Sequence, residues 1–144
     1  MPQRKNLRVI VDTNVFISYL IGKRLKGLKS LLIDSKIELI FAEQNLTEIQ
    51  IVTSRDKFRK YFKKEDVSDL IEFIRIIGVV YVITKDCLIC RDPKDNFLLS
   101  LSEENCADYL VTGDKDLLDI KKHFKTQIIT VEEFEKIIKK STKA

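Results

Sequence analysis

The segment at residues 8–17 (RVIVDTNVFI) most strongly constrains how this chain can fold. Its residues 9–11 are consecutive β-branched residues without polar alternation, which predicts a central strand buried on both faces. Asp12 follows at the carboxyl end of this strand, and Asn14 lies near the start of an apolar helix. Because ligands bind at this edge of open α/β sheets, Asp12 is a candidate site residue. The alternative is that Asp12 or Asn14 only caps the helix.

Apolar runs with strand character alternate with amphipathic helical segments along the rest of the chain. The further predicted strands are residues 37–41, 79–83, 109–112 and 128–129, and the run at 79–83 reads as buried. Such alternation predicts the α/β class, a three-layer α/β/α sandwich with a central parallel sheet of four to five strands. The length of 144 residues predicts one domain, residues 1–144, with its core at about residues 7–138.

Several residues mark where helices begin and end. Asp92 followed by Pro93 is typical of an N-cap and a first helical position. Residues 130–133 (TVEE) form a capping-box pattern that opens a last helix. Gly22 and Gly78 are predicted to end two earlier helices.

The charge distribution permits a polyanionic partner without requiring one. The net charge is +4, and basic residues gather at residues 23–29 and 55–64. The second segment also contains Phe58, Tyr61 and Phe62, whose spacing would place them on one helix face. Aromatic residues among basic ones either bind single-stranded nucleic acid or dock a surface helix onto its own core.

Composition excludes several other classes of protein. No apolar run approaches the roughly 20 residues of a membrane span, so a cytoplasmic protein is expected. Three cysteines without a secretion signal argue against a disulfide framework. Cys87 and Cys90 have zinc-knuckle spacing, but no second pair accompanies them and His123 is the sole histidine. Half-buried thiols are the favoured interpretation.

Four acids are candidates for one shared site. Asp12 and Asp114 follow predicted strands, Asp95 lies in the first turn of a helix, and Glu48 lies on the helix after the second strand. Each has an ordinary explanation, such as a cap or a surface charge. Together at one edge of the sheet they would repel one another unless a cation neutralised them. Oxygen ligands of this kind suit Mg²⁺ or Mn²⁺ and can support phosphoryl chemistry.

Other nucleotide-binding and catalytic motifs are absent from the sequence. There is no Gly-x-Gly-x-x-Gly after the first strand, no phosphate-binding loop and no serine elbow. A phospho-acceptor signalling domain would need a second acid beside Asp12, where the chain has Thr13 and Asn14. This interpretation is therefore disfavoured.

The motifs at these acids resemble those of the PIN-domain nucleases. The resemblance rests on residues 11–15 (VDTNV), on Glu48, on residues 95–98 (DNFL) and on residues 111–118 (VTGDKDLL). It spans about residues 7–138 and is closest to prokaryotic single-domain members classed as toxins of toxin–antitoxin pairs. It implies a Mg²⁺- or Mn²⁺-dependent site that hydrolyses RNA phosphodiester bonds.

Positions carried over from the family give each residue an implied role. The catalytic and metal-binding acids would be Asp12, Glu48, Asp95 and Asp114. The supporting polar residues would be Thr13, Asn14, Thr112 and Asp116. The implied partners are an RNA substrate, an antitoxin protein and a second copy in a homodimer. The alternative is a PIN-like module that binds RNA or protein without catalysis.

Overall fold

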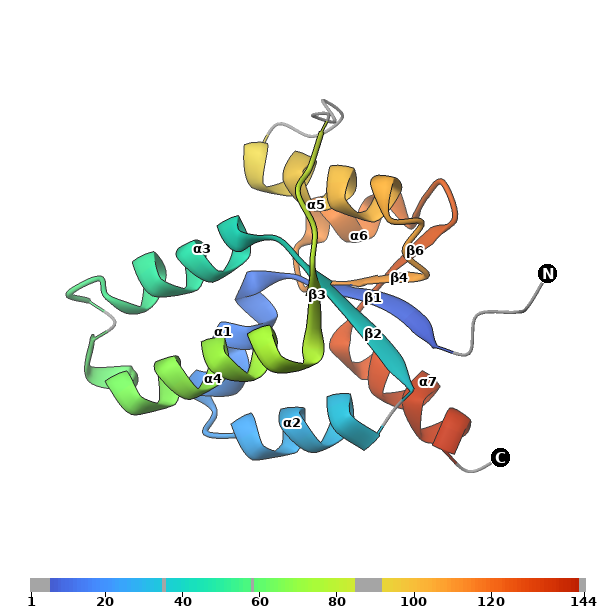
Figure 1. Cartoon of the computed structure of the whole chain (residues 1–144). Coiled ribbons are helices and arrows are strands. Elements are labelled where there is room, and N and C mark those ends of the chain that lie inside the picture. Colours follow the sequence, from blue (N-terminus) through green and yellow to red (C-terminus); the bar gives the residue numbers. More distant parts are fainter. Residues whose placement is uncertain (1–5, 35, 58, 85–91, 143–144) are drawn as a thin grey trace.

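The computed structural model describes residues 6–34, 36–57, 59–84 and 92–142 (Figure 1). In chain order the elements are β1 (Leu7–Val11), α1 (Thr13–Ile21), α2 (Leu25–Asp34), β2 (Ile37–Phe41), α3 (Glu43–Thr53), the 3₁₀ turn η1 (Arg59–Tyr61), α4 (Lys64–Ile77), β3 (Gly78–Val80), α5 (Pro93–Glu104), β4 (Tyr109–Val111), α6 (Lys115–Ile120), β5 (Lys122–His123), β6 (Thr126–Ile129) and α7 (Val131–Thr142). Cys87 and Cys90, which were predicted to be half-buried thiols, lie outside the described residues.

One mixed sheet carries the described strands in the order β3-β2-β1-β4-β6-β5. β1 lies near its middle, where Val9 is opposite Leu39 of β2 and Tyr109 of β4 in parallel registers. The strands from β3 to β6 in this order are parallel, and β5 pairs with β6 antiparallel. The predicted α/β class with a mostly parallel sheet is therefore confirmed.

Five strands are parallel, within the predicted four to five, and β5 is an additional antiparallel strand that was not predicted. Lys122 and His123 fold back onto β6 through a turn at Phe124, whose φ of 55° lies in the left-handed region. Two residues are too few to show a strand period, so the sequence pattern carries no signal for this element.

Helices cover both faces of the sheet, as the continuous apolar strand 9–11 predicts. Val9 and Val11 face the core formed with α1, α2, α3, α4 and α7. Ile10 points to the opposite face, where it packs with residues of α5 and α6. Figure 1 shows α5 and α6 on one side of the strands and the remaining helices on the other. Successive side chains of a strand point to opposite faces, so β1 needs apolar residues at each of its buried positions, 9–11.

The prediction of a buried strand at residues 79–83 is wrong. β3 spans Gly78–Val80 at the edge of the sheet, and Val80 and Val82 are 52% and 79% exposed. The N–H of Tyr81 donates a 2.8 Å hydrogen bond to the carbonyl of Phe41, which extends the pairing by one residue. A β-branched run predicts a strand but does not reveal how many neighbours that strand has.

The basic segment at residues 55–64 also differs from its prediction. Apart from Lys64, which begins α4, its described residues form only the short 3₁₀ turn η1, so Tyr61 and Phe62 do not share an α-helical face. Phe62 packs against the core, whereas Tyr61 is 52% exposed. Phe58 lies outside the described residues.

The predicted caps are confirmed where they can be tested. The side chain of Asp92 accepts a 2.9 Å hydrogen bond from the N–H of Lys94, and Pro93 begins α5. Thr130 and Glu133 exchange side-chain and backbone hydrogen bonds at the start of α7. These caps fix where α5 and α7 leave the sheet, and the first turn of α5 lies at the site described next.

Candidate functional site

The site lies at the ends of two neighbouring strands, β1 and β4, from which the chain continues to opposite sides of the sheet. The chain continues from β1 toward β2 on one side, whereas β4 is followed by β6 on the other side. The carboxyl ends of β1 and β4 are neighbours, because Val11 is opposite Val111. Crevices at such switch points are where open α/β sheets bind ligands. Asp12 and Thr112 are the residues that directly follow these two strands.

Asp12 is buried, at 6% exposure, and both of its carboxylate oxygens accept hydrogen bonds. Oδ1 accepts from the N–H of Asn14 at 3.1 Å, and Oδ2 accepts from the hydroxyl of Thr112 at 2.7 Å. Burial raises the pKa of Asp12, the two hydrogen bonds oppose this shift, and the negative charges of Glu48 and Asp114 add to it. Asp12 therefore caps α1, as the alternative interpretation expected, and it also faces other acids.

Asp114 caps α6 in the same way and is connected to Asp12 through Thr112. Its N–H donates to the Thr112 hydroxyl at 3.0 Å, and its Oδ1 accepts from the N–H of Asp116 at 2.9 Å. The Thr112 hydroxyl thus accepts a hydrogen bond from the backbone N–H of Asp114 and donates one to the carboxylate of Asp12.

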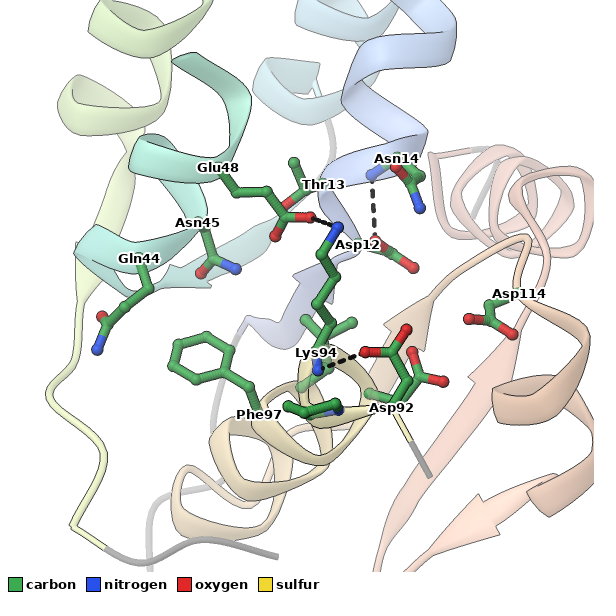
Figure 2. A pocket seen from close by; sticks show the side chains of 13 residues that line it. Asp12, Thr13, Asn14, Gln44, Asn45, Glu48, Asp92, Lys94, Phe97 and Asp114 are labelled. Carbon is green, nitrogen blue, oxygen red and sulfur yellow. Dashed lines mark hydrogen bonds and ion pairs between the residues drawn. The ribbon is translucent and has the colours of Figure 1, made fainter. Parts of the chain in front are cut away.

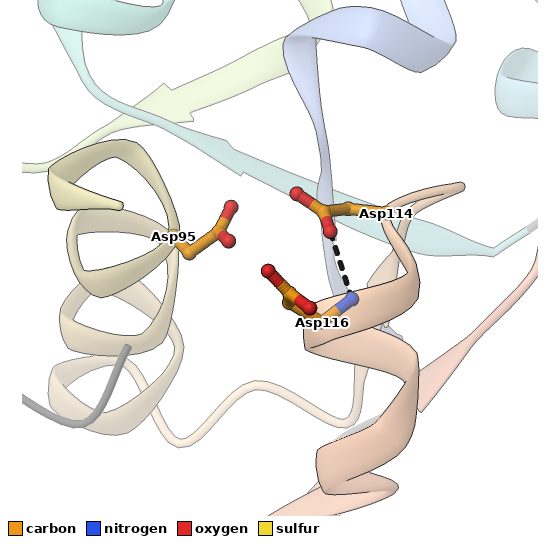
Figure 3. Close-up of side chains that lie close together, drawn as sticks. All are labelled: Asp95, Asp114 and Asp116. Atoms are coloured by element: carbon orange, nitrogen blue, oxygen red, sulfur yellow. Dashed lines mark hydrogen bonds between the residues drawn. The ribbon is translucent and has the colours of Figure 1, made fainter. Parts of the chain in front are cut away.

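Asp95 faces Asp114 and Asp116 across the gap between α5 and α6 (Figure 3). Asp95 is 4% exposed, and these three carboxylates each offer an oxygen within 4.8 Å of the others. Burial and the negative charge of Asp114 raise the pKa of Asp95 to about 7. In the metal-free protein, Asp95 therefore keeps its proton up to a pH well above the range in which an aspartate usually ionises.

Glu48 lies on α3 and lines a pocket of about 320 Å³, on the wall that faces α5 (Figure 2). Its Oε1 forms an ion pair with the Lys94 ammonium at 2.6 Å, and its side chain is 23% exposed. The hydrogen bond to Glu48 is the main cause that raises the pKa of Lys94. The predicted acids Asp12, Glu48, Asp95 and Asp114 all line this one pocket.

Comparison with known proteins identifies the family. The sequence profile of the PIN domain matches residues 8–116, about three quarters of the chain. The chain belongs to the PIN-domain family. A relative in Methanocaldococcus jannaschii, the uncharacterized protein MJ1680, is 30% identical over 151 aligned positions that cover 94% of this chain and 97% of the relative.

Not all of the predicted site residues of this PIN domain lie in one tight group. Asp95 and Asp114 share their tight group with Asp116, which the sequence placed among the supporting residues. Asp12 and Glu48 line the same pocket but lie outside that group. Of the predicted supporting residues, Thr13 and Asn14 line the pocket, and Thr112 is fully buried behind Asp12.

Several pocket residues of the PIN domain were not among the predicted site residues, and Lys94 and Asn45 are two of them that make polar contacts within the site. Lys94 follows Pro93 at the start of α5, where its side chain crosses the pocket to Glu48. Asn45 lies three positions before Glu48 on α3, and its Oδ1 accepts a 2.7 Å hydrogen bond from the N–H of Ala42. The three-residue spacing from Glu48 places Asn45 on the same face of α3, so the sequence could have predicted Asn45 as a pocket residue. No local sequence pattern indicates that Lys94 lies in the pocket.

The donor set of the PIN domain fits a hard divalent cation. Asp95, Asp114 and Asp116 supply carboxylate oxygens, the ligands that Mg²⁺ and Mn²⁺ prefer. Burial first, and then the nearby charge of Asp114, raise the pKa of Asp95, which is the expected cost of burying crowded carboxylates without a cation. No helix in the described part of the chain is both long and apolar enough to cross a membrane.

Proposed function

We propose that this PIN domain is a divalent-metal-dependent endoribonuclease that uses Mg²⁺ or Mn²⁺. The observation that carries the proposal is the group of Asp95, Asp114 and Asp116 at the carboxyl end of the sheet, beside the buried Asp12. Three carboxylates this close together repel one another, so the arrangement is suited to a bound cation. The family supplies the general class, since a PIN domain has a nuclease fold.

In this proposal Asp95 and Asp114 hold the cation, with Asp12 or Asp116 completing its ligands. The bound ion would supply positive charge to the scissile phosphate and lower the pKa of water beside it. Thr112 orients Asp12 and Asp114 through the hydrogen bonds that its hydroxyl makes with both residues. Glu48 would orient the attacking water, because its ion pair with Lys94 engages Oε1 and leaves Oε2 for the pocket.

RNA is the proposed substrate class on grounds of charge and family. The chain carries a net charge of +4, and its basic segments at residues 23–29 and 55–64 would attract a phosphate backbone. Such attraction offsets the repulsion that the acidic pocket exerts on an incoming phosphate. The role of a toxin with an antitoxin partner, the homodimer and the cytoplasmic location are further proposals that rest on the family resemblance.

The test is cleavage of labelled RNA by the purified protein with Mn²⁺ or Mg²⁺. We expect cleavage with either ion, none in excess EDTA, and none by Asp114→Asn with either ion. Asp119→Asn is the matched control, because Asp119 is an exposed acid of the same helix, α6, that does not line the pocket. Equal cleavage in EDTA would contradict the proposed mechanism.

Two further readouts separate the finer proposals. RNA binding without turnover across varied substrates in Mn²⁺ would favour the non-catalytic module instead. Expression in a bacterial host should arrest growth if the domain acts as a toxin, and Asp114→Asn should relieve the arrest. Arrest by both forms would contradict a nuclease toxin.

A further inference from the structure

Lys94 provides a cation within the acidic pocket itself. Its ammonium lies 2.6 Å from Oε1 of Glu48, and the two residues come from α5 and α3 on opposite walls (Figure 2). Lysine carries its charge at neutral pH because its ordinary pKa is near 10.4. Among the described residues that line this pocket, Lys94 is the only basic one.

Two sets of acids at the pocket differ in whether a cationic side chain is paired with them. Asp95 and Asp114 lie with Asp116, and within the described part of the chain no ion pair joins a lysine or arginine to any of the three. Glu48 is already paired with Lys94. A divalent cation placed at Glu48 would have to displace the ammonium or lie next to it, and like charges a few ångströms apart repel each other.

We infer that the site binds one divalent cation, at Asp95 and Asp114 with their neighbours, and that the ammonium of Lys94 occupies the place of a second cation at Glu48. This inference rests on the proposed function, because it presupposes a metal ion in the pocket. Lys94 is then a positioning residue that fixes the number of ions.

The start of α5 holds Lys94 in the right place for this role. Its backbone N–H is bonded to Asp92, and Pro93 precedes it as the first helical residue. The next residue, Asp95, belongs to the other acid group. One helical turn therefore presents an ammonium to Glu48 and a carboxylate to Asp114, which separates the two groups across the pocket.

The test counts Mn²⁺ ions bound by the metal-free protein, by calorimetry and by electron paramagnetic resonance of free Mn²⁺. We expect one ion per chain for the wild type and two for Lys94→Met, because the variant exposes Glu48 to a second ion. Lys94→Met with Glu48→Gln should return to one ion. Lys94→Arg, which keeps the charge, should also bind one.

Lys115→Met is the matched control. Lys115 is exposed, begins α6 beside Asp114, and does not line this pocket, so its loss changes the net charge equally without freeing Glu48. We expect one ion for this variant. Two ions here would mean that general charge sets the count, which would overturn the role of Lys94.

The remaining outcomes separate this inference from the proposed function. Two ions in the wild type, or one ion in Lys94→Met, would overturn the inference and leave a metal-dependent nuclease intact. No ion in the wild type would overturn both. Cooperative thermal unfolding checks that Lys94→Met folds, and Lys94→Gln replaces it otherwise, because the lysine side chain is 54% exposed and tolerates change.

Discussion

The hydroxyl of Thr112 donates a 2.7 Å hydrogen bond to Oδ2 of Asp12, although the two residues lie 100 positions apart in the chain. The same hydroxyl accepts from the N–H of Asp114 at 3.0 Å. A single buried side chain therefore orients the acids that follow β1 and β4. This contact connects the topology of the sheet to the geometry of the site.

Thr112→Val should destabilise the protein and weaken its binding of Mn²⁺. The substitution keeps the shape of a fully buried side chain but removes the partner of both Asp12 and Asp114. Leaving buried polar groups without partners costs about 1–3 kcal/mol, which urea denaturation of the metal-free protein would measure. Thr112→Ser keeps the hydroxyl and should lose less stability. Equal losses in both variants would show that the methyl group matters and the hydrogen bonds do not.

Asp12→Asn should strongly reduce cleavage without unfolding the protein. The substitution removes a charge whose burial, together with the nearby charges of Glu48 and Asp114, raises the pKa of Asp12. The metal-free variant should thus be as stable as the wild type or more so. Activity should fall by at least roughly 10–100-fold, as when a partner of a metal site is lost. Mn²⁺ should also raise its melting temperature less than it does for the wild type. An unfolded variant would mean that Asp12 is chiefly a structural acceptor.

Two glycines should respond in opposite ways to substitution by alanine. A Cβ at Gly78 would lie 2.7 Å from both the carbonyl oxygen of Ile74 and Cδ1 of Phe41, so Gly78→Ala should cost about 1–3 kcal/mol of stability. Gly27 lies within α2 with no atom within 4 Å of an added Cβ. Gly27→Ala should therefore stabilise the protein by about 0.5–1 kcal/mol through helix propensity. Denaturant unfolding measures both, and a neutral Gly78→Ala would contradict the close packing of α4 against β2.

The sequence predicted the features that a local pattern encodes. The strand at residues 9–11 is buried on both faces because each of its positions is apolar, and Asp92 with Pro93 begins a helix because both residues favour that geometry. The convergence of Asp12 and Asp114 followed from the rule that parallel strands end at one edge.

Other features depend on contacts that no local pattern encodes. The exposure of Val80 follows from the edge position of β3, which depends on the order of all the strands. The ion pair between Lys94 and Glu48 depends on how α3 and α5 face each other across the pocket. The grouping of Asp116 with Asp95 likewise depends on the short α6 lying beside the start of α5.

The contribution of Asp95 to the stability of the metal-free protein should fall as the pH rises from about 4 to about 7. Asp95 has a pKa of about 7 when folded, whereas an aspartate in the unfolded chain has an ordinary pKa near 3.8. Between these values the folded state binds more protons than the unfolded state, so the free energy of unfolding decreases with increasing pH. Below about pH 4 both states are protonated at this group, and its contribution to stability is then fully present.

Asp95→Asn should remove much of this pH dependence, because asparagine does not titrate. Urea denaturation in EDTA at pH 5 and pH 8 should show a smaller difference for the variant, by at least about 1 kcal/mol, the equivalent of roughly one pKa unit. Asp119→Asn, which changes an exposed acid, should retain the wild-type dependence. Saturating Mn²⁺ should reverse the trend in the wild type, because the cation binds the ionised carboxylates and its affinity rises as Asp95 loses its proton. If the wild type and Asp95→Asn show the same pH dependence, Asp95 is already ionised at pH 5. The crowding of carboxylates beside Asp114 would then not explain why this pocket is suited to a cation.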